Sequence, residues 1–128
     1  MTTSPERKRT VLVADDDPDI QSLVVLGLER CGFDVLRASD GQEALELALS
    51  ELPDLAVLDI TMPKLDGCEV TRTLRANAET AGMPVILLSA RVQDGDVARG
   101  LEAGATEYVK KPFSPQELGE RVSSLLGS

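Results

Sequence analysis

The feature that most constrains this chain is a regular alternation of short apolar runs with amphipathic stretches. Residues 11–14, 55–58 and 85–88 are continuously apolar, and the more mixed segments 33–38 and 106–110 continue the alternation. A continuous apolar run of this length indicates a strand buried on both faces, as in a parallel sheet. Strands that alternate with helices predict right-handed crossovers and helices on both faces of the sheet. We therefore expect an α/β fold, a doubly wound five-stranded parallel sheet, with the least hydrophobic strand at an edge.

The stretches between the strands carry signals for helix starts. Asp17 before Pro18, Asp66 three residues before Glu69, and the Ser39–Glu43 and Ser114–Glu117 segments are typical of N-caps and capping boxes. Helical spacing then predicts the buried faces. The expected face of the first helix is Ile20, Leu23, Val24, Leu28 and Cys31, and that of the second is Leu45, Ala48, Leu49 and Leu52.

Composition limits the function classes. The 128 residues suit one domain, which we place at residues 9–128 behind a flexible N-terminal arm, residues 1–8. With 22 acidic and 13 basic residues the net charge is −9, so direct nucleic-acid and membrane partners are disfavoured. The sequence contains neither a membrane-spanning run nor a signal peptide, and its two cysteines form no metal or redox motif. These observations favour a cytoplasmic protein with reduced thiols.

Polar residues follow four of the predicted strands. Asp15 and Asp16 come after the first strand, Asp59 after the third, Ser89 after the fourth and Lys111 after the fifth. Because the strands are parallel, these side chains should meet at one edge of the sheet. Three clustered carboxylates repel one another unless a cation joins them, and an oxygen-only ligand set favours Mg²⁺. A carboxylate–Mg²⁺ site with a lysine and a hydroxyl suggests phosphoryl transfer, with Asp59, at the centre, as nucleophile.

The same residues carry a family resemblance that extends from Arg9 to Leu126. The matching pieces are Val-Leu-Val-Ala-Asp-Asp-Asp-Pro, Asp-Gly-Gln-Glu-Ala-Leu, Leu-Asp-Ile-Thr-Met-Pro-Lys-Leu-Asp-Gly, Leu-Ser-Ala and Tyr-Val-Lys-Lys-Pro-Phe. In this order and spacing the sequence resembles the receiver domain of response regulators in two-component signalling, of the chemotaxis-receiver type. The resemblance implies the flavodoxin-like strand order 2-1-3-4-5.

The resemblance also implies a role for each site residue. Asp59 would be the phosphoacceptor. Asp15, Asp16 and Asp59 would bind Mg²⁺, together with the backbone carbonyl of Thr61. Ser89 would be the switch hydroxyl.

Two further residues complete the implied site. Lys111 would contact the phosphoryl group, and Tyr108 would be the aromatic switch residue. The family also suggests a cis peptide between Lys111 and Pro112. The fourth helix, fifth strand and fifth helix would then form the face that controls a partner or output domain, or that forms a dimer on phosphorylation.

The expected donor is external, because the chain contains no histidine. A histidine kinase or a histidine phosphotransfer protein would supply the phosphoryl group. On this interpretation the chain is not an enzyme in the usual sense, since it catalyses only its own phosphorylation and dephosphorylation.

Two alternatives share parts of the pattern. An FMN-binding flavodoxin-like protein would have the same fold, but residues 15–17 would repel a phosphate and flanking aromatics are missing. Phosphatases with an aspartate nucleophile have an Asp-x-Asp pattern that begins at the nucleophile. Here the corresponding residues are Asp59-Ile60-Thr61, which lack the second acid that would act on the leaving group. A nucleotide-binding enzyme is disfavoured because neither GxGxxG nor a P-loop occurs.

Overall fold

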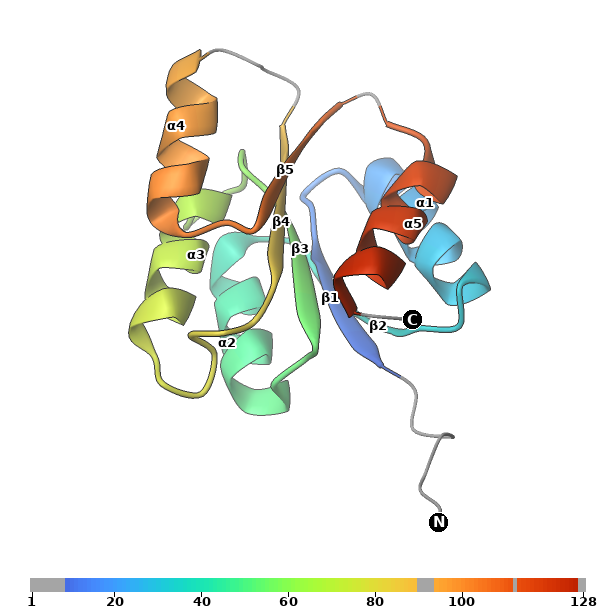
Figure 1. The fold of residues 1–128 in the computed structure, drawn as a ribbon, viewed down its shortest axis with the longest axis horizontal. Helices are drawn as coiled ribbons and strands as arrows, with labels where there is room; N and C mark the ends of the chain where they lie inside the picture. Colours follow the sequence, from blue (N-terminus) through green and yellow to red (C-terminus); the bar gives the residue numbers. More distant parts are fainter. Residues whose placement is uncertain (1–8, 90–93, 112, 127–128) are drawn as a thin grey trace.

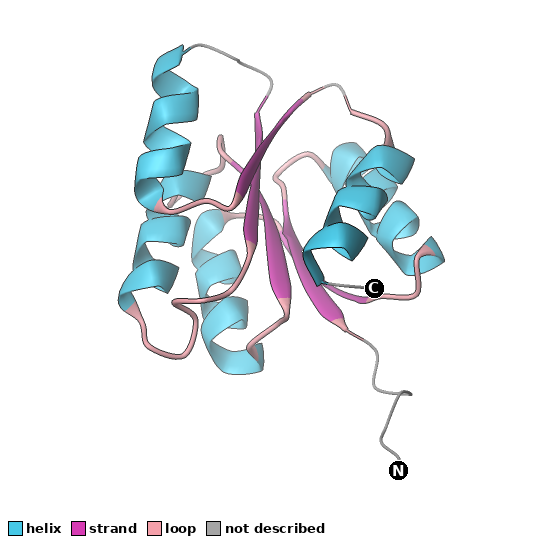
Figure 2. Cartoon of the chain, viewed as in Figure 1, coloured by secondary structure: helices cyan, strands magenta, loops and turns pink. Residues whose placement is uncertain are grey.

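The computed structural model describes residues 9–89, 94–111 and 113–126, which form a sheet covered by helices (Figures 1 and 2). The strands are β1 (Thr10–Ala14), β2 (Asp34–Ala38), β3 (Leu55–Asp59), β4 (Val85–Ser89) and β5 (Glu107–Lys110). The helices are α1 (Pro18–Arg30), α2 (Gly41–Glu51), α3 (Gly67–Ala76), α4 (Asp94–Ala103) and α5 (Pro115–Leu126). Residues 1–8, the predicted arm, lie outside the described part of the chain.

The sheet has the expected topology. Its five strands are all parallel and lie in the order β2-β1-β3-β4-β5, so β3 is central and the weakly hydrophobic β5 is at an edge. Helices α1 and α5 cover one face of the sheet, and α2, α3 and α4 cover the other (Figure 1). The predicted doubly wound α/β fold is therefore confirmed.

Two apolar layers explain why the strands are continuously hydrophobic. Alternate residues of one strand point to opposite faces. In β3, Leu55 and Val57 pack in the layer beneath α1 and α5, whereas Ala56 and Leu58 pack beneath the other three helices. All four side chains are fully buried. A strand covered on both faces has no position for a solvated residue until it reaches its end.

Side-chain caps fix where the helices begin. Asp17 accepts hydrogen bonds from the backbone N–H groups of Asp19 and Ile20, at the predicted start of α1. Asp66 and Glu69 form a reciprocal capping box at the start of α3. Each cap satisfies backbone donors that the first helical turn leaves unpaired, so the chain turns into a helix soon after leaving the sheet.

The predicted buried face of α1 was partly wrong. Leu23 is 52% exposed and Cys31 is exposed, whereas Gln21 and Val25, which were not predicted, are buried. Leu23 instead lines an open pocket between α1 and the start of α5, together with Gly27 and Pro115, which leaves half of its surface in contact with solvent.

The second helix shows a similar difference. Its sheet-facing positions are the small residues Ala44 and Ala48, while Leu49 and Leu52 are 36% and 42% exposed. Small side chains let a helix approach the sheet closely, which moves the larger residues to the rim of the contact.

None of the helices in the described part of the chain has the length and apolar character that a membrane span requires.

Candidate functional site

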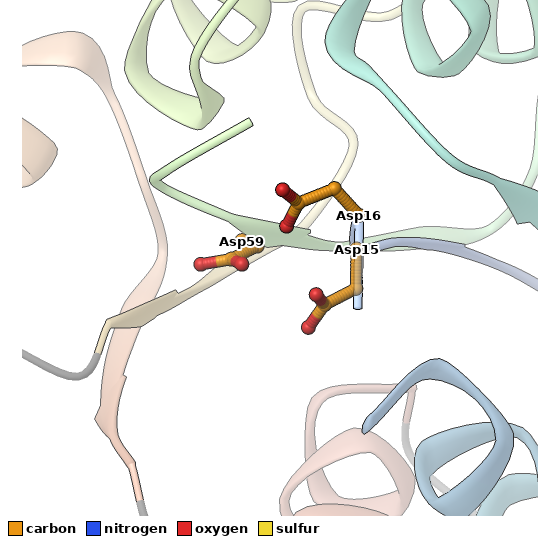
Figure 3. A group of neighbouring side chains, drawn as sticks. All are labelled: Asp15, Asp16 and Asp59. Atoms are coloured by element: carbon orange, nitrogen blue, oxygen red, sulfur yellow. The ribbon is translucent and has the colours of Figure 1, made fainter. Parts of the chain in front are cut away.

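Three carboxylates lie together where β1 and β3 end. Asp15 directly follows β1 and Asp59 is the last residue of β3, and these strands are hydrogen-bonded neighbours. One carboxylate oxygen from each of Asp15, Asp16 and Asp59 lies within 4.8 Å of the other two, and Figure 3 shows the group at the strand ends. Asp15 and Asp59 are buried, whereas Asp16 is exposed. The predicted acidic cluster is therefore present.

Lys111 reaches this cluster from the far edge of the sheet. Its Nζ donates hydrogen bonds to Oδ2 of Asp15 and Oδ2 of Asp59, both at 3.2 Å. The backbone N–H of Lys111 donates to the carbonyl of Ser89 at 2.7 Å, which ties the start of its loop to the end of β4. The lysine side chain is only 17% exposed. One cation therefore bridges two buried carboxylates.

The electrostatics of the site are unbalanced. Burial, together with repulsion from Asp15, raises the pKa of Asp59 from 3.8 to about 6, although the Lys111 ammonium acts against this rise. Burial alone would lower the pKa of Lys111, but attraction to Asp59 and Asp15 outweighs it and raises that pKa. A single lysine therefore does not fully compensate the buried acids, and further positive charge would be favourable here.

The donor set fits a hard divalent cation. The three clustered ligand atoms are all carboxylate oxygens, which suit Mg²⁺, and Mg²⁺ usually keeps several waters beside one or two carboxylates. The exposed position of Asp16 leaves one side of the cluster open to such waters. Thr61 lies beside the cluster, since its backbone N–H faces Oδ1 of Asp59 at 3.4 Å. The assignment of its carbonyl as a ligand stays a prediction.

Ser89 and Tyr108 lie in β4 and β5, the two strands between the acidic cluster and the edge of the sheet. Ser89 ends β4 and is buried, as expected for a residue at the site edge. Tyr108 lies opposite Leu87 in the sheet and is half-buried beside α4, where a Cβ on Gly100 would approach its ring to 3.4 Å. Tyr108 is therefore a neighbour of α4 rather than part of the acidic cluster. Pro112, and with it the suggested cis peptide, lies outside the described residues.

Sequence reasoning missed Gln21, which holds the Asp15 backbone. It is buried, and its Nε2 donates to the carbonyls of Ala38 at 2.8 Å and Asp15 at 3.3 Å. Oδ1 of Asp15 also accepts from the backbone N–H of Asp17 at 2.9 Å. The sequence did contain a signal for this role, since Gln21 is a polar residue within the apolar stripe of α1. A buried amide needs hydrogen-bond partners.

Comparison with known proteins decides the family. The sequence matches the response regulator receiver domain over residues 11–123. The chain belongs to this family. The chain is 47% identical over 118 residues to the alkaline phosphatase synthesis transcriptional regulatory protein PhoP of Bacillus subtilis. The aligned residues make up 92% of this chain and 48% of PhoP. The receiver domain is therefore the phosphoacceptor module of two-component signalling.

Solved receiver structures agree over nearly the full chain. A putative response regulator from Chloroflexus aurantiacus superimposes with a TM-score of 0.89 at 35% identity, covering 95% of this chain and all of that one. The receiver domain of the sensor histidine kinase PA1611 from Pseudomonas aeruginosa, which has a magnesium ion in its active-site cleft, gives a TM-score of 0.88 at 31% identity, with coverages of 95% and 100%.

The receiver domain accounts for about half the length of the curated relatives that it matches. PhoP is a transcriptional regulatory protein. The expectation of no direct nucleic-acid contact concerns this domain alone and stays a prediction.

Proposed function

We propose that Asp59 accepts the phosphoryl group, with Mg²⁺ held by Asp15, Asp16, Asp59 and the backbone carbonyl of Thr61. The observation that carries the proposal is the position of the Asp59 carboxylate, buried on the central strand with Lys111 Nζ at 3.2 Å. The magnesium ion in the similar PA1611 receiver supports this choice of metal.

The hydrogen bonds of the two buried acids favour Asp59 over Asp15 as the nucleophile. Asp15 is held from both sides, since Oδ1 accepts from Asp17 at 2.9 Å and Oδ2 from Lys111. Asp59 has the same contact to Lys111, but among the described residues the contact given for its other oxygen is a long one, 3.4 Å to the backbone N–H of Thr61. A weakly solvated carboxylate with one loosely held oxygen is a better nucleophile than one that is fully hydrogen-bonded.

The chemistry is a transfer from nitrogen to oxygen. An oxygen of the Asp59 carboxylate attacks phosphorus of an external phosphohistidine, the N–P bond breaks, and the imidazole leaves with the bonding pair. Mg²⁺ would supply charge neutralisation at the phosphoryl oxygens. Lys111 is placed to move its ammonium from the carboxylate to the new phosphoryl oxygens, and the product is an acyl phosphate on Asp59.

The signal would leave through Ser89 and Tyr108. The Ser89 hydroxyl would turn toward the new phosphoryl group, and Tyr108 would turn inward, changing the face formed by α4, β5 and α5. Charge-assisted hydrogen bonds are each worth about 1.5–3 kcal/mol. Two or three of them match the roughly 5.5 kcal/mol that reverses a 1:99 equilibrium.

The wider role follows from these steps. The donor would be a histidine kinase or a histidine phosphotransfer protein, and the changed face would control a downstream protein, an output domain or a dimer. The chain would catalyse only its own phosphorylation and dephosphorylation, in the cytoplasm.

Mass spectrometry after incubation with acetyl phosphate and Mg²⁺ tests the acceptor. The wild type should gain one phosphoryl group, and Asp59→Asn should gain none. Asp54→Asn is a matched control, because Asp54 precedes the opposite end of β3, where it accepts from the backbone of Thr10 at 2.8 Å. Labelling of the Asp59→Asn variant, or FMN binding or phosphate-ester hydrolysis by the wild type, would contradict the assignment.

A further inference from the structure

The loop that follows β3 rests on the first turn of α2. We call residues 60–66 the acceptor loop. Within it the carbonyl of Pro63 accepts two hydrogen bonds, from the N–H of Leu65 at 2.8 Å and from the N–H of Gly41 at 3.3 Å. Lys64, between Pro63 and Leu65, has a φ of 73°. A hydrogen bond across one residue with this φ is typical of the rare, strained form of γ-turn. Such strain persists only where the surrounding structure holds it.

Gly41 is the residue of α2 that receives this loop. It is buried, and it does not have a positive φ, so the backbone of the helix itself does not require glycine. A Cβ on Gly41 would lie 1.9 Å from the carbonyl oxygen of Leu65 and 2.6 Å from its carbonyl carbon. Both are backbone atoms, so no side-chain rotation could relieve the overlap. The loop, and not the helix, therefore excludes a side chain at position 41.

Two contacts then determine where Thr61 lies. On one side, Ile60 donates to the carbonyl of Leu88 at 2.9 Å and accepts from the N–H of Gly67 at 3.0 Å. On the other side, the turn after Thr61 is docked on Gly41. Thr61 is exposed and lies between these two anchored points.

We infer that Gly41 is a positioning residue for the phosphoacceptor site: its missing side chain lets the acceptor loop settle on α2 at the depth that brings the Thr61 backbone to the acidic cluster. This inference rests on the proposed magnesium site. Gly41 itself touches neither the reacting carboxylate nor, in the proposed site, the metal.

The size of the overlap gives the expected effect. An ordinary Cβ contact begins at 3.4 Å, so a methyl group at position 41 would displace the backbone of Leu65 by about 1.5 Å. Loss of a group that orients metal ligands typically weakens metal binding by about 10–100-fold. A misplacement of about 1 Å can also slow a reaction by about 100-fold. Gly41→Ala should therefore weaken Mg²⁺ binding by about 10-fold or more.

Calorimetric titration of Mg²⁺ into three variants tests the inference. Gly41→Ala should show the weaker binding. Ala48→Gly, on the buried face of the same helix, should lower the melting temperature but keep the Mg²⁺ affinity. Gly82→Ala should change neither property, because a Cβ there meets no atom within 4 Å. Wild-type Mg²⁺ affinity in folded Gly41→Ala, or an equal loss of affinity in Ala48→Gly, would overturn the inference.

An NMR titration of the wild type with Mg²⁺ tests the same inference and does not depend on whether Gly41→Ala folds. On addition of Mg²⁺ the amide signals of Gly41 and Leu65 should shift with the same midpoint as that of Thr61. The backbone N–H of Glu43, in the same turn of α2, donates a hydrogen bond to the Asp40 carboxylate at 2.8 Å. Its amide signal should shift less. A response at Thr61 with none at Gly41 would refute the positioning role, whereas no Mg²⁺ binding by the wild type would refute the proposed metal site instead.

Discussion

Removing the charge of Asp59 should stabilise the metal-free protein. The pKa of this carboxyl in the folded state, about 6, lies above its ordinary value of 3.8, because burial and Asp15 disfavour the ionised form. The folded state therefore binds the proton more tightly than the unfolded chain does. The resulting stability is complete below about pH 4 and is lost as the pH rises through 6. A rise of about two units in a pKa corresponds to at most about 3 kcal/mol, because solvent screens part of the interaction.

Asp59→Asn should recover this amount, since an amide has nearly the shape of the protonated acid. Urea denaturation in EDTA at pH 8 should give a higher free energy of unfolding for the variant, by up to about 3 kcal/mol, or a midpoint shift of up to about 2 M at a slope of about 1.5 kcal/mol/M. The difference should shrink toward zero at pH 4. Asp16→Asn, an exposed member of the same cluster, is the control and should change stability much less.

Mg²⁺ should narrow the difference in stability between the wild type and Asp59→Asn. At a concentration about 100 times the dissociation constant, a ligand that binds only the folded state adds about 2.7 kcal/mol. The wild type should gain this amount and the variant, which lacks one ligand, should gain less. An Asp59→Asn protein that is no more stable than the wild type at pH 8 in EDTA would show that burial and repulsion do not dominate at this site.

Three further outcomes follow from the contacts of other residues. Asp16→Ala should weaken Mg²⁺ binding about 10-fold in a calorimetric titration, and an unchanged affinity would remove Asp16 from the metal site. Lys111→Gln should raise the pKa of Asp59 further, because the ammonium now opposes that rise, and it should lower metal-free stability more at pH 8 than at pH 4, where the contact to Asp59 no longer counts. Arg75→Ala should cost about 2–3 kcal/mol in urea denaturation, because its guanidinium donates to four backbone carbonyls of the α3–β4 loop and the end of α4. The exposed Arg72→Ala is its control, and equal losses in the two variants would contradict the role of these contacts.

The fold and the acidic cluster could be predicted from the sequence because both depend on local signals. A strand buried on two faces must be apolar throughout, so the first polar residue after residues 11–14 or 55–58 marks its end. Parallel strands bring such ends to one edge, which predicts that Asp15, Asp59 and Lys111 lie near one another, and Lys111 forms ion pairs with both acids. These predictions needed only residue types, their period and the direction of the strands.

Other features depended on contacts between segments far apart in the chain. The orientation of α1 is set by how it packs on the sheet and α5, so helical spacing did not reveal that Leu23 is exposed and Gln21 is buried against Asp15. The requirement for glycine at position 41 comes from the backbone of Leu65, 24 positions along the chain, and not from the dihedral angles of α2. Sequence periodicity reports which residues share a face of one element, whereas only tertiary packing decides which segment comes to lie against that face.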